Sequence, residues 1–548
     1  MPLVLPVLGL LLYSSAGRDD AYITYWAADS LKRTGRISNI NGGRLEQSTS
    51  LLHTAVLAAA SWITTIDVPR LGYALAIVFG ALSTVAAYAL GRRLDPAAGA
   101  PAAIIVATLG PLVYWSFGGL ETSLAAFLLL ASMLSVARLL RAREVDRRDL
   151  LLAFMATAGV VLVRPDCGLA LGIACGVAAS ILSIRRRSRH DVTRAVTAFL
   201  GVAFAAFAMI GAVTVARLIY FGEPMPHPVL TKQGSHALSR YLHAFAHPLV
   251  STAYIRTTFL QSGAFVAGII ALVAVARRAR ASNPMVTLTA CTATVGMTIV
   301  GLSGGDWMEA GRLLAPWLAL VGVLAGVGVA SLQKAVWVAI GTIVVVIANL
   351  AGNLDYVRTT STGTPLWERV GPVHGPWDEV RNSTHRRDLL FIPHAEEVTR
   401  ALIAASPRPR IASGQAGMVV YYLASELRHE GLPFEFVDLY GLTTSQLAHC
   451  GNGARPTSRG RLVSVPFWVT HTKTCGPPPD AVIGSGDAPA FDNALAGVPR
   501  YYHTIFDLQA KPGAEFIAVS TDLVEPVVAR LRSQGWHCAP AGPCRPPD

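Results

Sequence analysis

Two adjacent carboxylates, Asp19 and Asp20, follow the first apolar run of the chain. One of them could act as a general base on an acceptor hydroxyl, or both could hold a divalent cation such as Mg²⁺ or Mn²⁺. Neighbouring side chains point in different directions, so the two acids need not share one task. We predict that Asp19 is the base and that Asp20 positions substrate or metal, with the reverse assignment open. The competing interpretation is a helix cap followed by a solvated acid.

Further polar segments interrupt the apolar pattern, and each alone could be a capped helix end or a proline-rich turn. These segments are 42–50, 118–123, 164–166, 220–232 and 304–312. Ionisable groups near a bilayer are costly and tend to mark function. The candidate donor- and acceptor-binding residues are Tyr22, Glu46, Glu121, Arg164, Asp166, His227, Lys232, Asp306, Trp307, Glu309 and Arg312.

Three chemical needs fit this set of residues. A polyprenyl phosphate needs cations at headgroup depth, which Arg164, Lys232 and Arg312 could supply. A polar sugar needs acids and aromatic rings, and a hydroxyl acceptor needs a base. The acids and rings in question are Asp166, Asp306, Trp307 and Tyr22.

The elements that must hold these residues are membrane helices. Of the 548 residues, 52% are hydrophobic and only 15% are charged, which is too apolar for an ordinary soluble enzyme. The net charge of +12 raises the question of nucleic-acid binding. The basic residues fall in short clusters between apolar runs, however, so membrane topology explains them better. We therefore expect membrane lipids, and no nucleic acid, as partners.

The basic clusters define the topology if all of them face the cytoplasm. They lie at 92–93, 141–148, 185–189, 277–280 and 334. The spans are then 71–91, 99–117, 120–140, 149–163, 168–184, 195–216, 262–277, 285–303, 311–330 and 335–352. The short run at 2–13 is read as a first span whose start is truncated, a signal peptide being the alternative, which makes about eleven spans. The loop 14–49 and every candidate residue then lie outside, and the segment 50–66 lies at the outer surface or re-enters.

The chain divides by composition into a membrane domain at 1–354 and a soluble, extracytoplasmic domain at 355–548. Strands are predicted at 410–423, 435–439, 481–483 and 515–520, and helices at 395–404 and 523–533, so the second domain is predicted to be α/β. Its four cysteines could form up to two disulfides in an oxidising compartment, with the pairing open. These cysteines are Cys450, Cys475, Cys538 and Cys544.

The order of these motifs resembles the C-type, membrane-embedded glycosyltransferases, which take sugar from a polyprenyl phosphate. Within them the sequence is most similar to the actinobacterial branch that adds terminal arabinofuranose to cell-wall arabinan. The matching pieces are 18–23, Glu46 with 48–50, 119–122, 164–166, 220–222 with Pro226 and Lys232, 304–308 with Arg312, 414–417 and 437–443. The fold expected from this resemblance is an α-helical multi-span domain followed by an α/β domain.

The resemblance implies that the first-loop acid pair is catalytic and that decaprenyl-phospho-arabinofuranose is the donor. Glu309, Ala310 and Thr444 depart from the pattern of that branch, and they bear on the identity of the sugar more than on the reaction class. We predict a glycosyltransferase that moves a sugar from a polyprenyl-phosphate donor to a hydroxyl of a cell-envelope glycan. It would work on the outer face of the cytoplasmic membrane.

Two other classes of protein compete with this prediction. A polytopic transporter or lipid flippase with an extracytoplasmic domain would distribute charges at mid-membrane within inverted repeats. A non-catalytic scaffold would use the second domain to bind cell-wall glycan. The sequence gathers its charges on one side and shows no internal repeat, which favours the glycosyltransferase.

Overall fold

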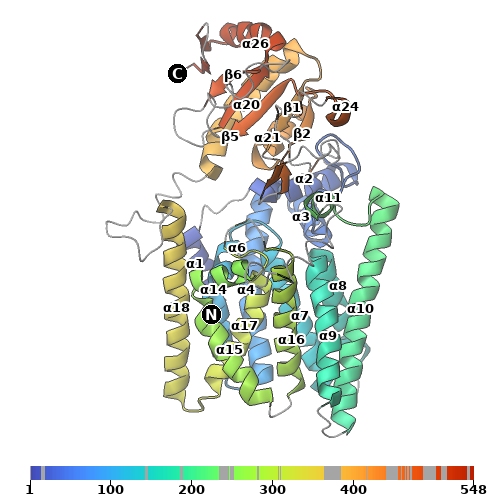
Figure 1. The fold of residues 1–548 in the computed structure, drawn as a ribbon, viewed down its shortest axis with the longest axis vertical. Coiled ribbons are helices and arrows are strands. Elements are labelled where there is room, and N and C mark those ends of the chain that lie inside the picture. Colours follow the sequence, from blue (N-terminus) through green and yellow to red (C-terminus); the bar gives the residue numbers. More distant parts are fainter. Residues whose placement is uncertain are drawn as a thin grey trace.

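The structure is a computed structural model in which a bundle of long helices carries a sheet-containing domain (Figure 1). The described residues are 2–13, 19–141, 146–184, 189–233, 246, 252–279, 283–305, 308, 310–362, 384–414, 416–439, 443, 455–457, 460–462, 465, 468, 472–485, 502–507, 515–539 and 543–547. This mostly helical architecture with a small sheet domain after the bundle confirms the predicted fold class.

The bundle consists of helices that, apart from α14 (Ala253–Gln261), follow the predicted spans closely. They are α1 (Val4–Tyr13), α4 (Val68–Leu94), α5 (Gly99–Thr108), α6 (Gly110–Trp115), α7 (Thr122–Arg141), α8 (Arg147–Val163), α9 (Pro165–Ile184), α10 (Arg189–Phe221), α14 (Ala253–Gln261), α15 (Ala264–Ala279), α16 (Pro284–Leu302), α17 (Ala315–Ala330) and α18 (Ala335–Thr362). Among the described residues, six helices are long and apolar enough to cross a membrane, or seven if the pair α14 and α15, bent by 106°, counts as one span. The count of about eleven stays a prediction.

Two predicted spans differ from the helices observed. The span predicted at 99–117 is broken at Leu109, whose backbone is extended, and Pro111 near the start of α6 cannot donate the hydrogen bond that would continue α5. The span predicted at 311–330 begins only at Ala315. Helix α17 is buried along its whole length and forms the centre of the bundle. Gly326 lets α5 approach closely, because a Cβ there would lie 2.6 Å from the backbone of Ala102.

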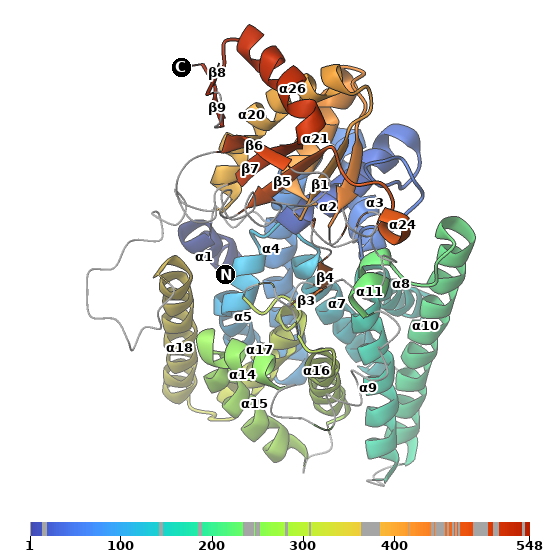
Figure 2. The same cartoon turned by 45° about the horizontal axis from the view of Figure 1, so that its top comes forward.

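A layer of shorter helices lies between the bundle and the sheet domain (Figures 1 and 2). It contains α2 (Asp19–Thr34), α3 (Leu51–Thr64) and α11 (His227–Gln233). The predicted outer loop 14–49 therefore contains a helix of 16 residues, α2, and the acid pair occupies its first turn. Acidic residues are favoured there because the helix macrodipole places partial positive charge at the N-terminus.

The domain after the bundle is α/β, as predicted. Its five-stranded sheet has the order β2-β1-β5-β7-β6, in which β1 is parallel to β2 and β5 while β7 is antiparallel to β5 and β6. The strands of this sheet are β1 (Arg410–Ser413), β2 (Glu435–Asp438), β5 (Ala481–Ser485), β6 (Tyr502–Asp507) and β7 (Glu515–Ser520). Its longer helices are α20 (Thr384–Ala405), α21 (Met418–His429) and α26 (Thr521–Ser533).

Smaller elements complete this domain. They are the hairpins β3 (Arg455–Thr457) with β4 (Gly460–Leu462) and β8 (His537–Cys538) with β9 (Cys544–Arg545), and the short helix α24 (Thr472–Cys475). Cys538 forms a disulfide with Cys544, and Cys475 is also disulfide-bonded. The division of the chain at 354 stays a prediction, since α18 continues past it to Thr362.

The prediction of one strand over 410–423 is wrong. Strand β1 ends at Ser413, and the run Met-Val-Val-Tyr-Tyr-Leu that follows is the start of helix α21. Its β-branched and aromatic residues favour a strand locally, but the apolar residues on both sides of it are covered by neighbouring elements. Tertiary packing therefore overrides the local propensity. Strand β6 was not predicted.

Candidate functional site

The acid pair lies where the first helical layer meets the sheet domain. Asp19 Oδ1 accepts a hydrogen bond from the backbone N–H of Met418 at 2.6 Å. Met418 is the first residue of α21, so the carboxylate faces the N-terminus of that helix, where N–H groups lack partners within the helix. Both Asp19 and Asp20 are half-buried. The contact joins the first predicted catalytic residue to the second domain.

Gly417 explains why this contact is so close. A Cβ at position 417 would lie 2.0 Å from the backbone oxygen of Asp19 and 2.4 Å from its Oδ1. No side chain fits there without separating α2 from α21. The last glycine of the Gly-Gln-Ala-Gly sequence at 414–417, which marked the resemblance, therefore has a steric explanation.

Helices α2 and α21 run side by side in the same direction and are joined by aromatic side chains. The ring of Tyr22 lies 5.4 Å from that of Tyr421 and 5.7 Å from that of Tyr422, both edge-on or tilted. Further along, Trp26 meets Tyr421 at 6.1 Å. Burial, and then neighbouring Tyr73, raise the pKa of Tyr22, so its phenol stays protonated at neutral pH.

Glu46 is placed by a buried ion pair that the sequence reasoning missed. Arg217 of α10 donates to both carboxylate oxygens of Glu46, at 2.7 and 2.9 Å, and the two residues are 5% and 3% exposed. The backbone N–H of His227 donates to the backbone oxygen of Glu46 at 3.0 Å. Burial raises the pKa of Glu46, and Arg217 opposes that rise. A lone arginine within the apolar run of α10 was the available signal.

The segment that carries Glu46 is also attached to α2. Gln47 Nε2 donates to the backbone oxygen of Ile23 at 2.7 Å, and the hydroxyls of Thr24 and Ser48 lie 3.0 Å apart. Ser50 caps the N-terminus of α3. These bonds hold Glu46 and α3 on one side of α2.

Glu121 lies on a second segment that α2 fixes in place. Tyr25 Oη donates to the backbone oxygen of Gly119 at 3.0 Å. Gly119 has φ of +72°, and a Cβ there would lie 2.1 Å from that hydroxyl, so only glycine is accommodated. Glu121 is 3% exposed and acts electrostatically on buried His53 of α3 and on Arg164. Burial lowers the pKa of His53 to about 4, against the effect of Glu121.

Arg164 and Asp166 form the third group, at the junction of α8 and α9. Arg164 donates to both oxygens of Asp166, at 3.1 Å from Nε and 2.6 Å from Nη2. Its side chain is 7% exposed and that of Asp166 is 37% exposed. Within the described part of the chain, Nη1 of Arg164 is buried and has no hydrogen-bond partner. A buried guanidinium N–H of this kind is suited to an incoming anion.

The remaining candidates are only partly described. Asp306, Trp307 and Glu309 lie outside the described residues, and of Lys232 only the backbone, in α11, is described. Arg312 is half-buried in the turn before α17, where Gly304, Gly305, Gly311 and Ala310 all have positive φ. Trp115 Nε1 donates to the backbone oxygen of Ala310 at 3.3 Å. The structure thus brings together the groups around α2, Glu46 and Glu121.

The second domain also holds the segment 39–44. Asn41 donates to the backbone oxygen of Phe436 at 2.7 Å and accepts from its N–H at 2.9 Å, so its amide pairs with the edge strand β2. Asn39 donates to the backbone oxygen of Thr443 at 3.0 Å, and Asp438 fixes Thr443 by accepting from its N–H at 2.9 Å. Two residues of the motif at 437–443 that marked the resemblance, Asp438 and Thr443, therefore help to fix the first outer segment.

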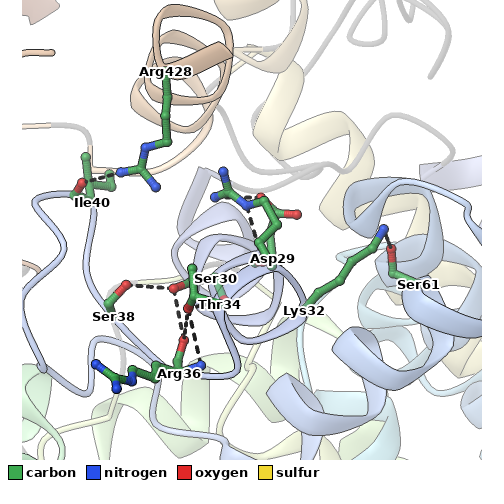
Figure 3. Close-up of polar contacts among 10 residues, drawn as sticks. Asp29, Ser30, Lys32, Thr34, Arg36, Ser38, Ile40, Ser61 and Arg428 are labelled. Carbon is green, nitrogen blue, oxygen red and sulfur yellow. Dashed lines mark hydrogen bonds and ion pairs between the residues drawn. The ribbon is translucent and has the colours of Figure 1, made fainter. Parts of the chain in front are cut away.

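The C-terminal half of α21 makes a further contact with this segment (Figure 3). Arg428 reaches the backbone oxygen of Ile40 at 2.9 Å, and its guanidinium lies 4.6 Å from the ring of Trp26. Burial, and then the charge of Arg33, lower the pKa of Arg428.

Metal binding by the acid pair stays a prediction: no group of three or more His, Cys, Asp or Glu suited to a metal ion occurs among the described residues.

Comparisons with known proteins address the fold. No protein-family model and no curated protein sequence matches the chain. An oligosaccharyltransferase from Archaeoglobus fulgidus, solved with Zn and sulfate, matches with a TM-score of 0.52 and 12% identity over 94% of this chain and 72% of that chain. The oligosaccharyltransferase AglB from the same organism, in complex with an inhibitory peptide and a dolichol-phosphate, matches with a TM-score of 0.50 and 12% identity over 95% and 76%.

A third match is weaker. The arabinofuranosyltransferase AftD from Mycobacteria has a TM-score of 0.43 and 15% identity over 94% of this chain, which covers only 41% of the AftD chain. The match to the oligosaccharyltransferases confirms the resemblance to C-type glycosyltransferases at the level of the fold.

Proposed function

We propose that this protein is a membrane glycosyltransferase that takes a sugar from a polyprenyl-phosphate donor and transfers it to a hydroxyl of a cell-envelope glycan. The sugar proposed is arabinofuranose, on the basis of the sequence motifs. The observation that carries the proposal is the attachment of the acid pair. Helix α2 presents Asp19 and Asp20 at the joint between a C-type bundle and its second domain, and Asp19 is fixed there by the N–H of Met418.

The acid pair would deprotonate the acceptor. The hydrogen bond from Met418 occupies Oδ1 of Asp19 and fixes the orientation of the carboxylate. A fixed base near the acceptor hydroxyl lowers the entropic part of the barrier. Asp20, one residue further along the helix, would position the substrate or share a divalent cation, Mg²⁺ or Mn²⁺, with Asp19. The reverse assignment of the two acids gives the same overall reaction.

The leaving group would be the lipid phosphate. Arg164 is the described cation best suited to it, since Asp166 fixes its guanidinium while Nη1 keeps an unused N–H. Charge-assisted hydrogen bonds to phosphate strengthen as negative charge develops on the leaving oxygen. Lys232 and Arg312 are proposed as further donor-binding cations, with Asp306, Trp307 and Glu309 binding the sugar or acceptor.

The contacts of Glu46 favour a different task for it from the one predicted above. Glu46 has both oxygens on Arg217, so we propose that it positions the segment 45–50 and does not touch the reacting atoms. His227, whose backbone N–H donates to the backbone oxygen of Glu46, stays a candidate for substrate binding. Tyr22 stays a candidate for sugar contact at the joint between α2 and α21.

The proposed location is the cytoplasmic membrane, with the second domain outside. The basic clusters support this orientation by the positive-inside rule. The disulfide between Cys538 and Cys544, together with the disulfide-bonded Cys475, supports it independently, since disulfides persist in oxidising compartments.

A transfer assay tests the proposal. Purified protein is incubated with radiolabelled decaprenyl-phospho-arabinofuranose and a short arabinan acceptor, beside Asp19→Asn and Asp20→Asn. Asp149→Asn, at the opposite end of the bundle, is the control. We expect transfer by the wild type and the control, and a loss of at least a hundredfold in one or both acid variants. Full transfer by both variants would refute the role of the acid pair. Transfer only from a different polyprenyl-phosphate sugar would refute arabinofuranose and keep the reaction class.

A further inference from the structure

A cavity of about 570 Å³ lies between the first outer segment and the second domain. One wall is the chain from Thr34 to Arg44, and the other consists of Arg408, the end of α21 and the segment 431–434. Its size falls in the range of pockets that bind small ligands. It does not include the acid pair, and the proposed chemistry does not use it.

The charge of this cavity is one-sided. No carboxylate is found among its lining residues. Four arginines line it, namely Arg36, Arg44, Arg408 and Arg428. All four are exposed, and none of them takes part in an ion pair within the described part of the chain. Several guanidinium groups around one space favour an anion, since each offers a planar fork of N–H donors to carboxylate or phosphate oxygens.

The walls of the cavity are fixed before any ligand arrives. The hydroxyls of Ser30 and Ser38 lie 2.6 Å apart, and Ser30 also donates to the backbone oxygen of Arg36 (Figure 3). Asn41 is tied to Phe436 by two hydrogen bonds, and Arg428 is held by Ile40 and Trp26. Arg44 lies over the ring of Tyr220. A site whose walls are already ordered loses less entropy on binding.

The cavity and the acid pair lie at opposite ends of α2. Asp19 begins this helix and Thr34, at its end, lines the cavity. The 16 residues of α2 correspond to roughly 22 Å at about 1.5 Å per residue. Helix α21 runs alongside α2 for roughly 15 Å, at about 1.5 Å per residue, from Met418 beside Asp19 to Arg428 at the cavity. A polymer chain lying along these two helices would reach both places.

We propose that this cavity is a remote subsite that binds an anionic group, carboxylate or phosphodiester, on the acceptor glycan. The inference rests on the proposed function. Binding energy gained at the cavity would hold the acceptor chain while its reacting hydroxyl lies at the acid pair, so it contributes to orientation at a distance. The occupant is a glycan and not a lipid headgroup, because α21, Arg408 and the segment 431–434 belong to the second domain and not to the membrane bundle.

A binding measurement tests the subsite without any donor. The full chain in nanodiscs of zwitterionic lipid is titrated with three labelled hexasaccharides of one backbone, which are neutral, carboxylate-bearing or phosphate-bearing. We expect at least one charged probe to bind about tenfold or more tighter than the neutral one, with an advantage that shrinks at high salt. The double variant Arg36→Gln/Arg408→Gln should lose this advantage. The control Arg530→Gln/Arg545→Gln removes two exposed charges elsewhere in the same domain and should keep it.

Equal affinity for all three probes, or an unchanged advantage in the double variant, would overturn the proposal. So would a preference for anionic lipid vesicles over the charged hexasaccharides.

A transfer assay then separates this proposal from the proposed function. The ratio of rates on charged and neutral acceptors should fall toward one in Arg36→Gln/Arg408→Gln. No transfer to any acceptor, with selective binding intact, would remove the role as acceptor subsite together with the proposed function. Transfer without charge preference would overturn the subsite alone.

Discussion

The carboxylate of Asp19 and the backbone N–H of Met418 are 399 residues apart in the chain and 2.6 Å apart in the structure. This hydrogen bond makes the second domain a part of the candidate active site, because the orientation of the first-loop acid depends on where α21 begins.

The first prediction concerns Gly417. In Gly417→Ala the new Cβ would lie against the backbone oxygen and carboxylate of Asp19, so α21 must move away. A misplacement of about 1 Å can cost about a hundredfold in rate. We expect transfer by the folded variant to fall by roughly tenfold to a hundredfold, with a loss of about 1–3 kcal/mol of stability from the overpacking. Gly176→Ala on α9, where a Cβ meets nothing within 4 Å, is the matched control. Normal transfer by Gly417→Ala would show that this contact does not position the acid.

The second prediction concerns the pair of Glu46 and Arg217. Removing one partner leaves a buried charge uncompensated, which costs about 3–5 kcal/mol, whereas replacing both by apolar groups of similar volume is nearly neutral. Thermal unfolding in detergent should therefore show a large loss for Arg217→Met and a much smaller one for Glu46→Leu/Arg217→Met. Equal losses in the single and double variants would show that leaving the Glu46 carboxylate without Arg217 has no cost of its own.

The third prediction is a pH dependence of stability from His53. Its pKa is about 4 in the folded protein and about 6.5 when unfolded, so the unfolded state binds the proton more tightly. The stability contributed by neutral His53 is complete above pH 6.5 and is lost as the pH falls toward 4, by about 3 kcal/mol in total at ~1.4 kcal/mol per pH unit. In His53→Gln, the free energy of unfolding, measured by denaturant titration at several pH values over this range, should depend less on pH. A pH dependence as steep in His53→Gln as in the wild type would show that His53 is not its source.

The fourth prediction concerns Asn41 and the edge strand β2. In Asn41→Ala, the N–H and the C=O of Phe436 both lose their partner. Hydrogen exchange at the Phe436 amide should become about fivefold to thirtyfold faster, since the opened pair costs about 1–2 kcal/mol. Asn41→Asp keeps an acceptor for that N–H and should restore most of the protection. The same exchange rate in wild type and Asn41→Ala would show that the contact is not formed in solution.

The helices of the bundle can be placed from the sequence because a bilayer requires long apolar stretches with basic flanks. Each such stretch is recognisable from neighbouring residues alone. The helix of the second domain at 395–404 and its strands at 435–439, 481–483 and 515–520 were predicted on similar local grounds. Helix α21 was missed because its first residues have strand propensity and only the packing of α2 and the sheet around them decides otherwise.

The site residues were harder to relate to one another than to find. Asp19, Glu46, Glu121 and Arg164 are visible as polar interruptions, but the bonds through Gln47, Tyr25 and Met418 that tie them to α2 are long-range. Hydropathy carries no information on such pairing. Arg217 is visible in the sequence as a single charge in an apolar run. Because ionisable residues within membrane segments are rare, such a residue predicts a buried partner or a functional role.

The joint between Asp19 and Met418 also sets the order in which the protein can become active. At a synthesis rate of about 5–20 residues per second, Met418 follows Asp19 out of the ribosome by roughly 20–80 s. During that interval the membrane helices are inserted while the acid pair lacks its partner. The second domain therefore completes the first segment, and the chain cannot assemble its candidate active site until α21 has been made and has folded against α2.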